Sequence, residues 1–192
     1  MISTPTIPTL TAPKLIDVVL GEFQTDLAAG LAWLDHSFGK AQIMKEVRDG
    51  REVVFPGVYV GQRDYLKVFP DEHIGNFSFF VVEDGETINY FRKSSDIQTR
   101  FGLVIWFDFR AVYPSDWQTR TIDNVKEDFL RAFAASSFRP GVQISVDKIF
   151  ERPGNVYREF TDKEIEAQYC MRPWGMIRAD GVIRFNQKAI CP

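Results

Sequence analysis

The first candidates for a side chain that acts as an acid, a base or a metal ligand are the two histidines of this sequence. His36 follows Asp35 near the end of an expected helix, where an imidazolium would interact favourably with the helix dipole. His73 stands in a loop beside Asp71 and Glu72, and these three side chains could ligate a metal ion. Adjacent residues of an extended loop rarely converge on one ion, and no further residue is placed to orient them. We therefore interpret the loop as a solvated acidic turn and predict no metal site.

Carboxylates recur in two other places, and both have a structural explanation. Asp162, Glu164 and Glu166 fall where a short helix is expected to begin, and negative charge stabilises a helix amino terminus. Asp108 and Arg110 lie two apart on one face of an expected strand, which is typical of a cross-strand salt link. No serine occupies a nucleophile elbow, and no glycine-rich run resembles a phosphate-binding loop. The sequence therefore predicts no catalytic residue, no cofactor and no enzymatic activity.

A basic and aromatic stretch between two expected strands is the remaining candidate. Aromatic side chains beside cations are typical of surfaces that hold single-stranded nucleic acid. Glu86 and Asp96 dilute the charge, however, and leave residues 86–100 at a net charge of only +1. We predict assembly or channel contacts here, with at most weak contact to passing DNA and a passive surface loop as the alternative. The candidate residues are Tyr90, Phe91, Arg92, Lys93 and Arg100.

Composition narrows the class of protein. The chain has 192 residues, and 45% of them are hydrophobic. Its net charge of −3 does not favour binding to nucleic acid or to an anionic membrane. No apolar run reaches the length of a transmembrane helix, and the first residues do not resemble a secretory signal. Cys170 and Cys191 match no metal or redox spacing, so we expect reduced thiols.

The stretch Phe101–Tyr113 must organise the fold, because it is apolar at every second position, as in a long strand. Apolar residues at helical spacing predict a helix of about 25 residues between Pro13 and Gly39, and a second helix capped by Thr121. Both helices should share one core with the strand. Its expected members are Phe23, Leu27, Leu31, Leu103, Ile105, Phe107, Phe129 and Phe133.

Short strands are expected in the rest of the chain. Asp49-Gly50 predicts a hairpin between Ala41–Arg48 and Arg51–Val60, and Pro56-Gly57 is expected to break its second strand into two pieces or to mark a bulge. Residues 84–100 read as an exposed polar excursion. Further strands are predicted at Asp64–Phe69, Asn76–Glu83 and Val142–Phe150.

The end of the chain is expected to close the sheet. Asp180-Gly181 predicts a terminal hairpin between Met176–Ala179 and Val182–Phe185. Three arginines are expected to form one polar sheet face, namely Arg172, Arg178 and Arg184. The predicted fold class is α+β: a mainly antiparallel sheet with two helices packed on one face and a C-terminal hairpin. Residues 1–12, uncharged and rich in proline and threonine, should form an extended arm, and residues 13–192 a single domain.

This order of elements resembles the tail-terminator and tail-completion (head-tail neck) proteins of tailed bacteriophages. Phe101–Phe109 followed by Ile122–Phe129, and the late segment Met171–Arg178, carry the resemblance. It covers residues 14–187, although residues 50–100 do not fit the family pattern. The family has no diagnostic motif, so no functional residue is carried over.

The resemblance implies a non-enzymatic structural subunit of a phage or prophage-derived particle. Proteins of that family form rings, usually hexamers, at the tail end or the head-tail neck, and contact other neck or tail proteins. The location implied is the virion, assembled in the cytoplasm of a bacterial host, with no membrane contact. A small-ligand or accessory protein-binding α+β domain is the alternative, and an enzyme is a third class.

Overall fold

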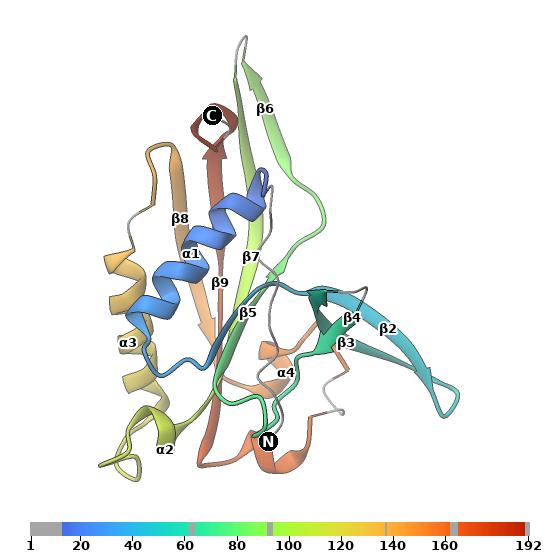
Figure 1. The fold of residues 1–192 in the computed structure, drawn as a ribbon, viewed down its shortest axis with the longest axis vertical. Coiled ribbons are helices and arrows are strands. Elements are labelled where there is room, and N and C mark those ends of the chain that lie inside the picture. Colours follow the sequence, from blue (N-terminus) through green and yellow to red (C-terminus); the bar gives the residue numbers. More distant parts are fainter. Residues whose placement is uncertain (1–12, 62–63, 92–93, 137, 162–164, 191–192) are drawn as a thin grey trace.

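A mixed sheet forms the centre of the molecule, and its strands run in the order β1-β5-β7-β9-β8 (Figure 1). The computed structural model describes residues 13–61, 64–91, 94–136, 138–161 and 165–190. β1 pairs parallel with β5, and the other pairs of this sheet are antiparallel. The strands are β1 (His36–Lys40), β5 (Phe77–Val82), β7 (Ser94–Asp108), β8 (Val142–Phe150) and β9 (Trp174–Asn186).

Two β-hairpins project from this centre in different directions (Figure 1). One is formed by β6 (Thr87–Phe91) and the first part of β7. The other belongs to a smaller antiparallel sheet of order β2-β3-β4. Its strands are β2 (Gln42–Arg48), β3 (Arg51–Gly61) and β4 (Asp64–Lys67).

Helices α1 (Ile16–Gly30) and α3 (Ile122–Ala135) lie on one face of the central sheet (Figure 1). The other face is covered by the smaller sheet and by the segment that contains α4 (Pro153–Val156) and the 3₁₀ turn η2 (Ala167–Cys170). Two short helices, α2 (Phe109–Val112) and α5 (Gln187–Ile190), follow β7 and β9. Among the described residues, no helix is both long and apolar enough to cross a membrane.

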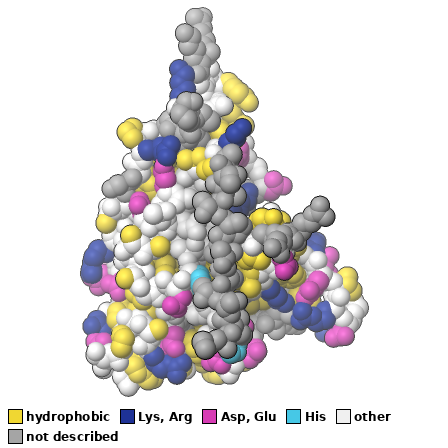
Figure 2. Space-filling model, in the orientation of Figure 1, with side chains coloured by type: hydrophobic (Ala, Val, Ile, Leu, Met, Phe, Trp, Pro, Cys, Tyr) yellow, Lys and Arg dark blue, Asp and Glu magenta, His cyan; other side chains and the backbone are white. Residues whose placement is uncertain are grey.

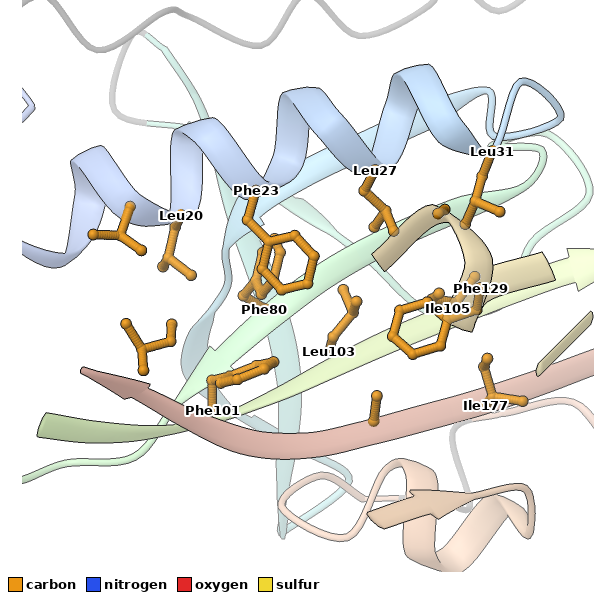
Figure 3. Packing of buried hydrophobic residues seen from close by; sticks show 14 of the residues in the cluster. Leu20, Phe23, Leu27, Leu31, Phe80, Phe101, Leu103, Ile105, Phe129 and Ile177 are labelled. Atoms are coloured by element: carbon orange, nitrogen blue, oxygen red, sulfur yellow. The ribbon is translucent and has the colours of Figure 1, made fainter. Parts of the chain in front are cut away.

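The core beneath α1 and α3 confirms the expected cluster. Phe23 of α1 packs on Phe80 of β5 at a ring-centroid distance of 5.3 Å, and Phe129 of α3 lies over Ile177 and Ile105 (Figure 3). All eight residues expected in this core belong to it, with Phe133 half-buried at its margin. A Cβ on Gly30 would lie 2.6 Å from the Cβ of Ala132, so this glycine lets the two helices approach closely.

A second core on the opposite face was not expected from the sequence. It is mainly aromatic, and Trp106 lies at its centre, stacked on Trp174 with ring centroids 4.9 Å apart. The sheet is therefore buried on both faces, and β7 is buried without interruption from Phe101 to Phe107. The predicted α+β class, a mainly antiparallel sheet with two helices packed on one face, is confirmed, and the elements that cover the opposite face were not foreseen.

Several elements agree with the sequence because their signals are local. The Asp49-Gly50 hairpin is present, with φ of 50° and 73° at these two residues, as a two-residue turn of this type requires. Thr121 and Asn124 form a capping box at the start of α3. β8 has the expected bounds. The predicted arm of residues 1–12 lies outside the described residues.

Three expectations in the first half of the chain are corrected. α1 ends at Gly30 instead of continuing toward Gly39, because the backbone of Asp35 and His36 bonds to Asn76 and starts β1. The polar stretch of residues 84–100 is exposed along β6, as expected, but it is not a loop, since β6 and the start of β7 form an antiparallel hairpin there. Pro56-Gly57 neither interrupts β3 nor forms a bulge in it: β3 pairs with β2 from Arg51 to Gly57 and with β4 from Gly57 onward, and its register shifts only between Tyr59 and Gly61.

Two expectations at strand ends are also corrected. β7 stops at Asp108, whose carboxylate accepts a hydrogen bond from Arg110 N (2.8 Å) and caps α2. β9 is one continuous strand, so the C-terminal hairpin at Asp180-Gly181 was wrong. A Cβ on Gly181 would overlap the carbonyl oxygen of Ser145 and lie 2.8 Å from the Phe101 ring. This glycine therefore serves close strand packing.

Candidate assembly surface

The hairpin formed by β6 and β7 presents apolar side chains to solvent. All residues of β6 are exposed, and the exposed fraction is 41% for Ile88, 80% for Tyr90 and 59% for Phe91. We call these three residues the hairpin patch. β6 pairs only with β7 among the described strands, so its outer edge has no described partner strand. Exposed aromatic side chains on an open strand edge indicate a contact surface.

The five predicted contact residues are only partly brought together. Tyr90 and Phe91 belong to the hairpin patch, whereas Arg92 and Lys93 lie outside the described residues. Arg100 is exposed on β7, but it lies five residues beyond the partner of Tyr90, about 17 Å along the strand. The structure does not bring Arg100 to the hairpin patch.

A second apolar surface lies on the hairpin of β2 and β3. The exposed fraction is 52% for Ile43 and 79% for Val47, and both point to the same face of β2 because they are four residues apart. We call these two residues the arm patch. Lys45 lies between them and forms an ion pair with Glu52 (3.0 Å) across the hairpin. Figure 2 shows hydrophobic side chains on both projections.

Sequence reasoning missed the arm patch, although its signal was present. A strand with one buried face alternates between apolar and polar residues. In β2 both faces mix the two kinds: Ile43, Lys45 and Val47 share one face, and Met44 lies on the other with Glu46. Such a mixture indicates a strand that projects from the core.

Charges of opposite sign, with no ion-pair partner among the described residues, lie near the two patches. Glu83, Asp84 and Glu86 are exposed in the turn that precedes β6, and none of them forms an ion pair with a described side chain. We call this segment the acidic turn. At the tip of the hairpin of β2 and β3, Arg48 and Arg51 face each other across the two strands, an unfavourable pairing of like charges. Arg48 is paired with Glu46, whereas Arg51 has no ion-pair partner among the described residues.

The strongest charged cluster lies inside the molecule, around Arg178 on β9. Its side chain is 1% exposed, and its guanidinium donates to Asp180 (2.6 Å), to both carboxylate oxygens of Glu159 and to the carbonyl of Val156 (3.2 Å). Burial would lower the pKa of Arg178, but the hydrogen bonds to Glu159 and Asp180 outweigh it and raise the pKa. Gly102 leaves room for the guanidinium, since a Cβ there would lie 2.6 Å from Cζ. The cluster ties the segment around α4 to the sheet.

The expected polar face of three arginines is therefore wrong for Arg178. Arg184 is exposed and donates to Gln98 (2.9 Å). Arg172 is exposed and donates to backbone carbonyls, including that of Trp117 (2.7 Å). Arg184 thus links β9 to β7, and Arg172 links the segment before β9 to the segment before α3.

The other residues with possible chemistry also have structural partners. His36 lies at the start of β1, not at a helix end, and stacks on Phe38 with ring centroids 5.4 Å apart. The backbone N–H of His73 donates to Asp71 (2.9 Å), as in a local turn. Glu166 accepts from Gln168 just before η2, while Asp162 and Glu164 lie outside the described residues. No group of three His, Cys, Asp or Glu side chains among the described residues is arranged to hold a metal ion.

Asp108 and Arg110 form a local pair instead of a cross-strand link. The guanidinium of Arg110 contacts both oxygens of Asp108 at 2.8–3.0 Å and lies 5.1 Å from the ring centroid of Trp174. The hydrogen bond to Asp108 is the largest of the interactions that raise the pKa of Arg110. The pair stabilises the transition from β7 to α2.

Hollows on the described surface are shallow and open. One lies beside β8 between Phe138, Ile144 and Arg184, and another lies between Lys40 and the acidic turn. Neither encloses a volume in which a small ligand would bury most of its surface. In comparisons with known proteins, no family model matches the chain and no curated protein is significantly similar to it.

Proposed function

We propose that the protein is a non-enzymatic structural subunit that assembles with copies of itself into a closed ring. One observation carries the proposal: two separate β-hairpins project from the core and expose apolar side chains at their surfaces. The exposed fraction is 80% for Tyr90 and 79% for Val47. Soluble domains seldom expose such side chains on open strand edges unless a partner covers them. Closed point-group symmetry lets identical subunits cover each other's patches.

We further propose that this ring belongs to a phage or prophage-derived particle, at the tail end or the head-tail neck. The resemblance in element order supports this placement, and the architecture of α1 followed by strands, α3 and later strands is compatible with it. The natural partners would be neighbouring neck or tail proteins, with contact to DNA weak and transient. A hexamer is the expected ring.

A small-ligand or accessory binding domain is the alternative, and the hollows beside β8 and the acidic turn are its candidate sites. Their openness gives a ligand little to bind. We therefore favour assembly over ligand binding.

Multi-angle light scattering over a range of protein concentrations, followed by negative-stain microscopy, tests this proposal. The expected result is a mass several times that of the 22.1 kDa chain and ring-shaped particles at high concentration. A protein that stays monomeric at every concentration, or that turns over a metabolite, would contradict it.

A further inference from the structure

We infer that the subunits join head to tail: the hairpin patch of one copy binds the arm patch of the next. This inference rests on the proposed self-assembly and specifies its contact. The two patches have different residues, lie on different strands and belong to hairpins that project in different directions (Figure 1). A contact of each patch with its own copy would require two independent two-fold interfaces. A single contact between unlike patches covers both, and its repetition closes a ring when the rotation from one subunit to the next returns to the first.

Charge complementarity identifies the second copy as the occupant. The acidic turn directly precedes the strand of the hairpin patch, and Glu86 is its last residue before β6. Arg51 lies at the end of the arm, next to Glu52, which faces Val47 of the arm patch. Each patch thus has at one end a charge with no ion-pair partner among the described residues, and the two charges have opposite signs. Bringing Glu86 of one copy to Arg51 of the next would also relieve the repulsion between Arg51 and Arg48.

The strand edges are complementary as well. β6 pairs only with β7 and β2 only with β3 among the described strands, so each has an outer edge with no described partner strand. When the two edges meet, main-chain hydrogen bonds between subunits can form as in strand addition. Ile88 and Tyr90 lie on one face of β6 and Ile43 and Val47 on one face of β2, since each pair is separated by an even number of residues.

A mixing experiment distinguishes this head-to-tail contact from two-fold contacts of each patch with its own copy. The hairpin variant carries Tyr90→Asp, and the arm variant carries Val47→Asp. Both native side chains are about four-fifths exposed, so the variants should fold, which circular dichroism and thermal melting verify. Met171→Asp is the matched control, because Met171 is an exposed apolar residue (61%) outside both patches. Mass is measured by light scattering for each protein alone and for a 1:1 mixture.

The expected results are specific. Each patch variant alone should be monomeric, with its dissociation constant raised at least about tenfold. The mixture should form a dimer and nothing larger, because the intact hairpin of one variant binds the intact arm of the other. The control should assemble like the unmodified protein.

Three outcomes would overturn the inference. A mixture that remains monomeric, while the unmodified protein assembles, refutes the head-to-tail contact but leaves the proposed function in place. A patch variant that dimerises alone indicates a two-fold contact through its intact patch. An unmodified protein that is monomeric throughout removes the proposed function and the inference together.

The charges provide an independent arm of the test. Arg51→Glu and Glu86→Arg should each weaken assembly at least severalfold at low salt, and the two changes combined in one chain should restore it. If the combined variant is as weak as the single ones, Arg51 and Glu86 do not meet.

Discussion

Arg178 has 1% of its side chain exposed, and each of the three nitrogens of its guanidinium donates at least one hydrogen bond. A sequence provides no direct sign of such burial, because arginine is usually exposed. The isolated Gly102 within an apolar strand was the one available signal, since a glycine there often marks a close approach. Long-range pairing of β7 with β9 places Gly102 opposite Asp180, two residues from Arg178. Only the fold therefore reveals the cluster.

We predict that Arg178→Met destabilises the protein by about 3 kcal/mol. This is the lower end of the range for breaking a buried ion pair, because Glu159 and Asp180 keep 24% and 19% of their side chains exposed. Arg184→Met is the control on the same strand, and its exposed position predicts a change within about 0.5 kcal/mol. Urea denaturation measures both. Equal effects of the two changes would show that Arg178 is not a structural tie.

Tyr157 illustrates a buried polar group that the fold leaves without a partner. Its side chain is 0% exposed, and its hydroxyl has no hydrogen-bond partner among the described residues. Burial, and to a smaller extent the charge of Cys170, raise the pKa of Tyr157 well above its ordinary value. The protonated form is therefore favoured in the folded state. Stability linked to this group is complete below about pH 10, where an unfolded tyrosine begins to ionise, and falls as the pH rises further.

Tyr157→Phe should thus leave stability at pH 7 unchanged or raise it slightly, because an unpaired buried hydroxyl is removed. Above about pH 10 the unmodified protein should lose up to about 1.4 kcal/mol more per pH unit than the variant. Tyr113 contributes a similar loss in both proteins, because burial and its hydrogen bond to Asp128 (2.5 Å) raise its pKa. Urea unfolding between pH 8 and pH 11 provides the comparison. If the stabilities of the two proteins changed in parallel with pH, the raised pKa would not belong to Tyr157.

Among the elements, the dipeptide Asp-Gly predicted a hairpin turn at two places, correctly at one and wrongly at the other. Asp49-Gly50 forms the expected hairpin turn at the end of a free arm, where nothing competes with the local preference. Asp180-Gly181 lies in the middle of β9, which pairs with β7 along 13 residue positions and with β8 on its other side. The free energy of those two ladders exceeds a turn preference. Long-range pairing is invisible to a local pattern, and this also explains the missed continuation of β7 through Ser94–Arg100.

Gly181→Ala should destabilise the protein by about 1–3 kcal/mol through overpacking, because its methyl group would overlap the backbone of Ser145 on β8. Gly21→Ala provides a contrast: nothing lies within 4 Å of its added Cβ in α1, so a gain of up to about 1 kcal/mol is expected. Thermal unfolding gives both values. Hydrogen exchange of the β8 amides should also accelerate in the Gly181 variant. Unchanged exchange and stability would mean that β8 and β9 are not packed in this way.

At the scale of the whole molecule, the buried core could be predicted from the sequence better than the exposed apolar patches. The core beneath α1 and α3 follows from helical and strand periodicity, which report burial directly. Of the candidate contact residues, Tyr90 and Phe91 were singled out because aromatic residues in a polar stretch are conspicuous, and the structure shows that both are exposed. The arm patch was missed, since Ile43 and Val47 look like ordinary strand residues until the hairpin is seen to leave the core. Exposure depends on where an element projects, and that is a property of the complete fold.

Assembly through these surfaces should be visible in the stability of the whole molecule. Because only folded subunits bind each other, mass action raises the melting temperature with protein concentration. A hundredfold increase adds up to about 2.7 kcal/mol per subunit, which corresponds to roughly 5–10 °C for a chain of this size. A variant with both Tyr90→Asp and Val47→Asp should melt at the same temperature at every concentration, whereas Met171→Asp should follow the unmodified protein. Scanning calorimetry at several concentrations measures these shifts. If the double variant retained the full concentration dependence, assembly would have to use a surface other than the two patches.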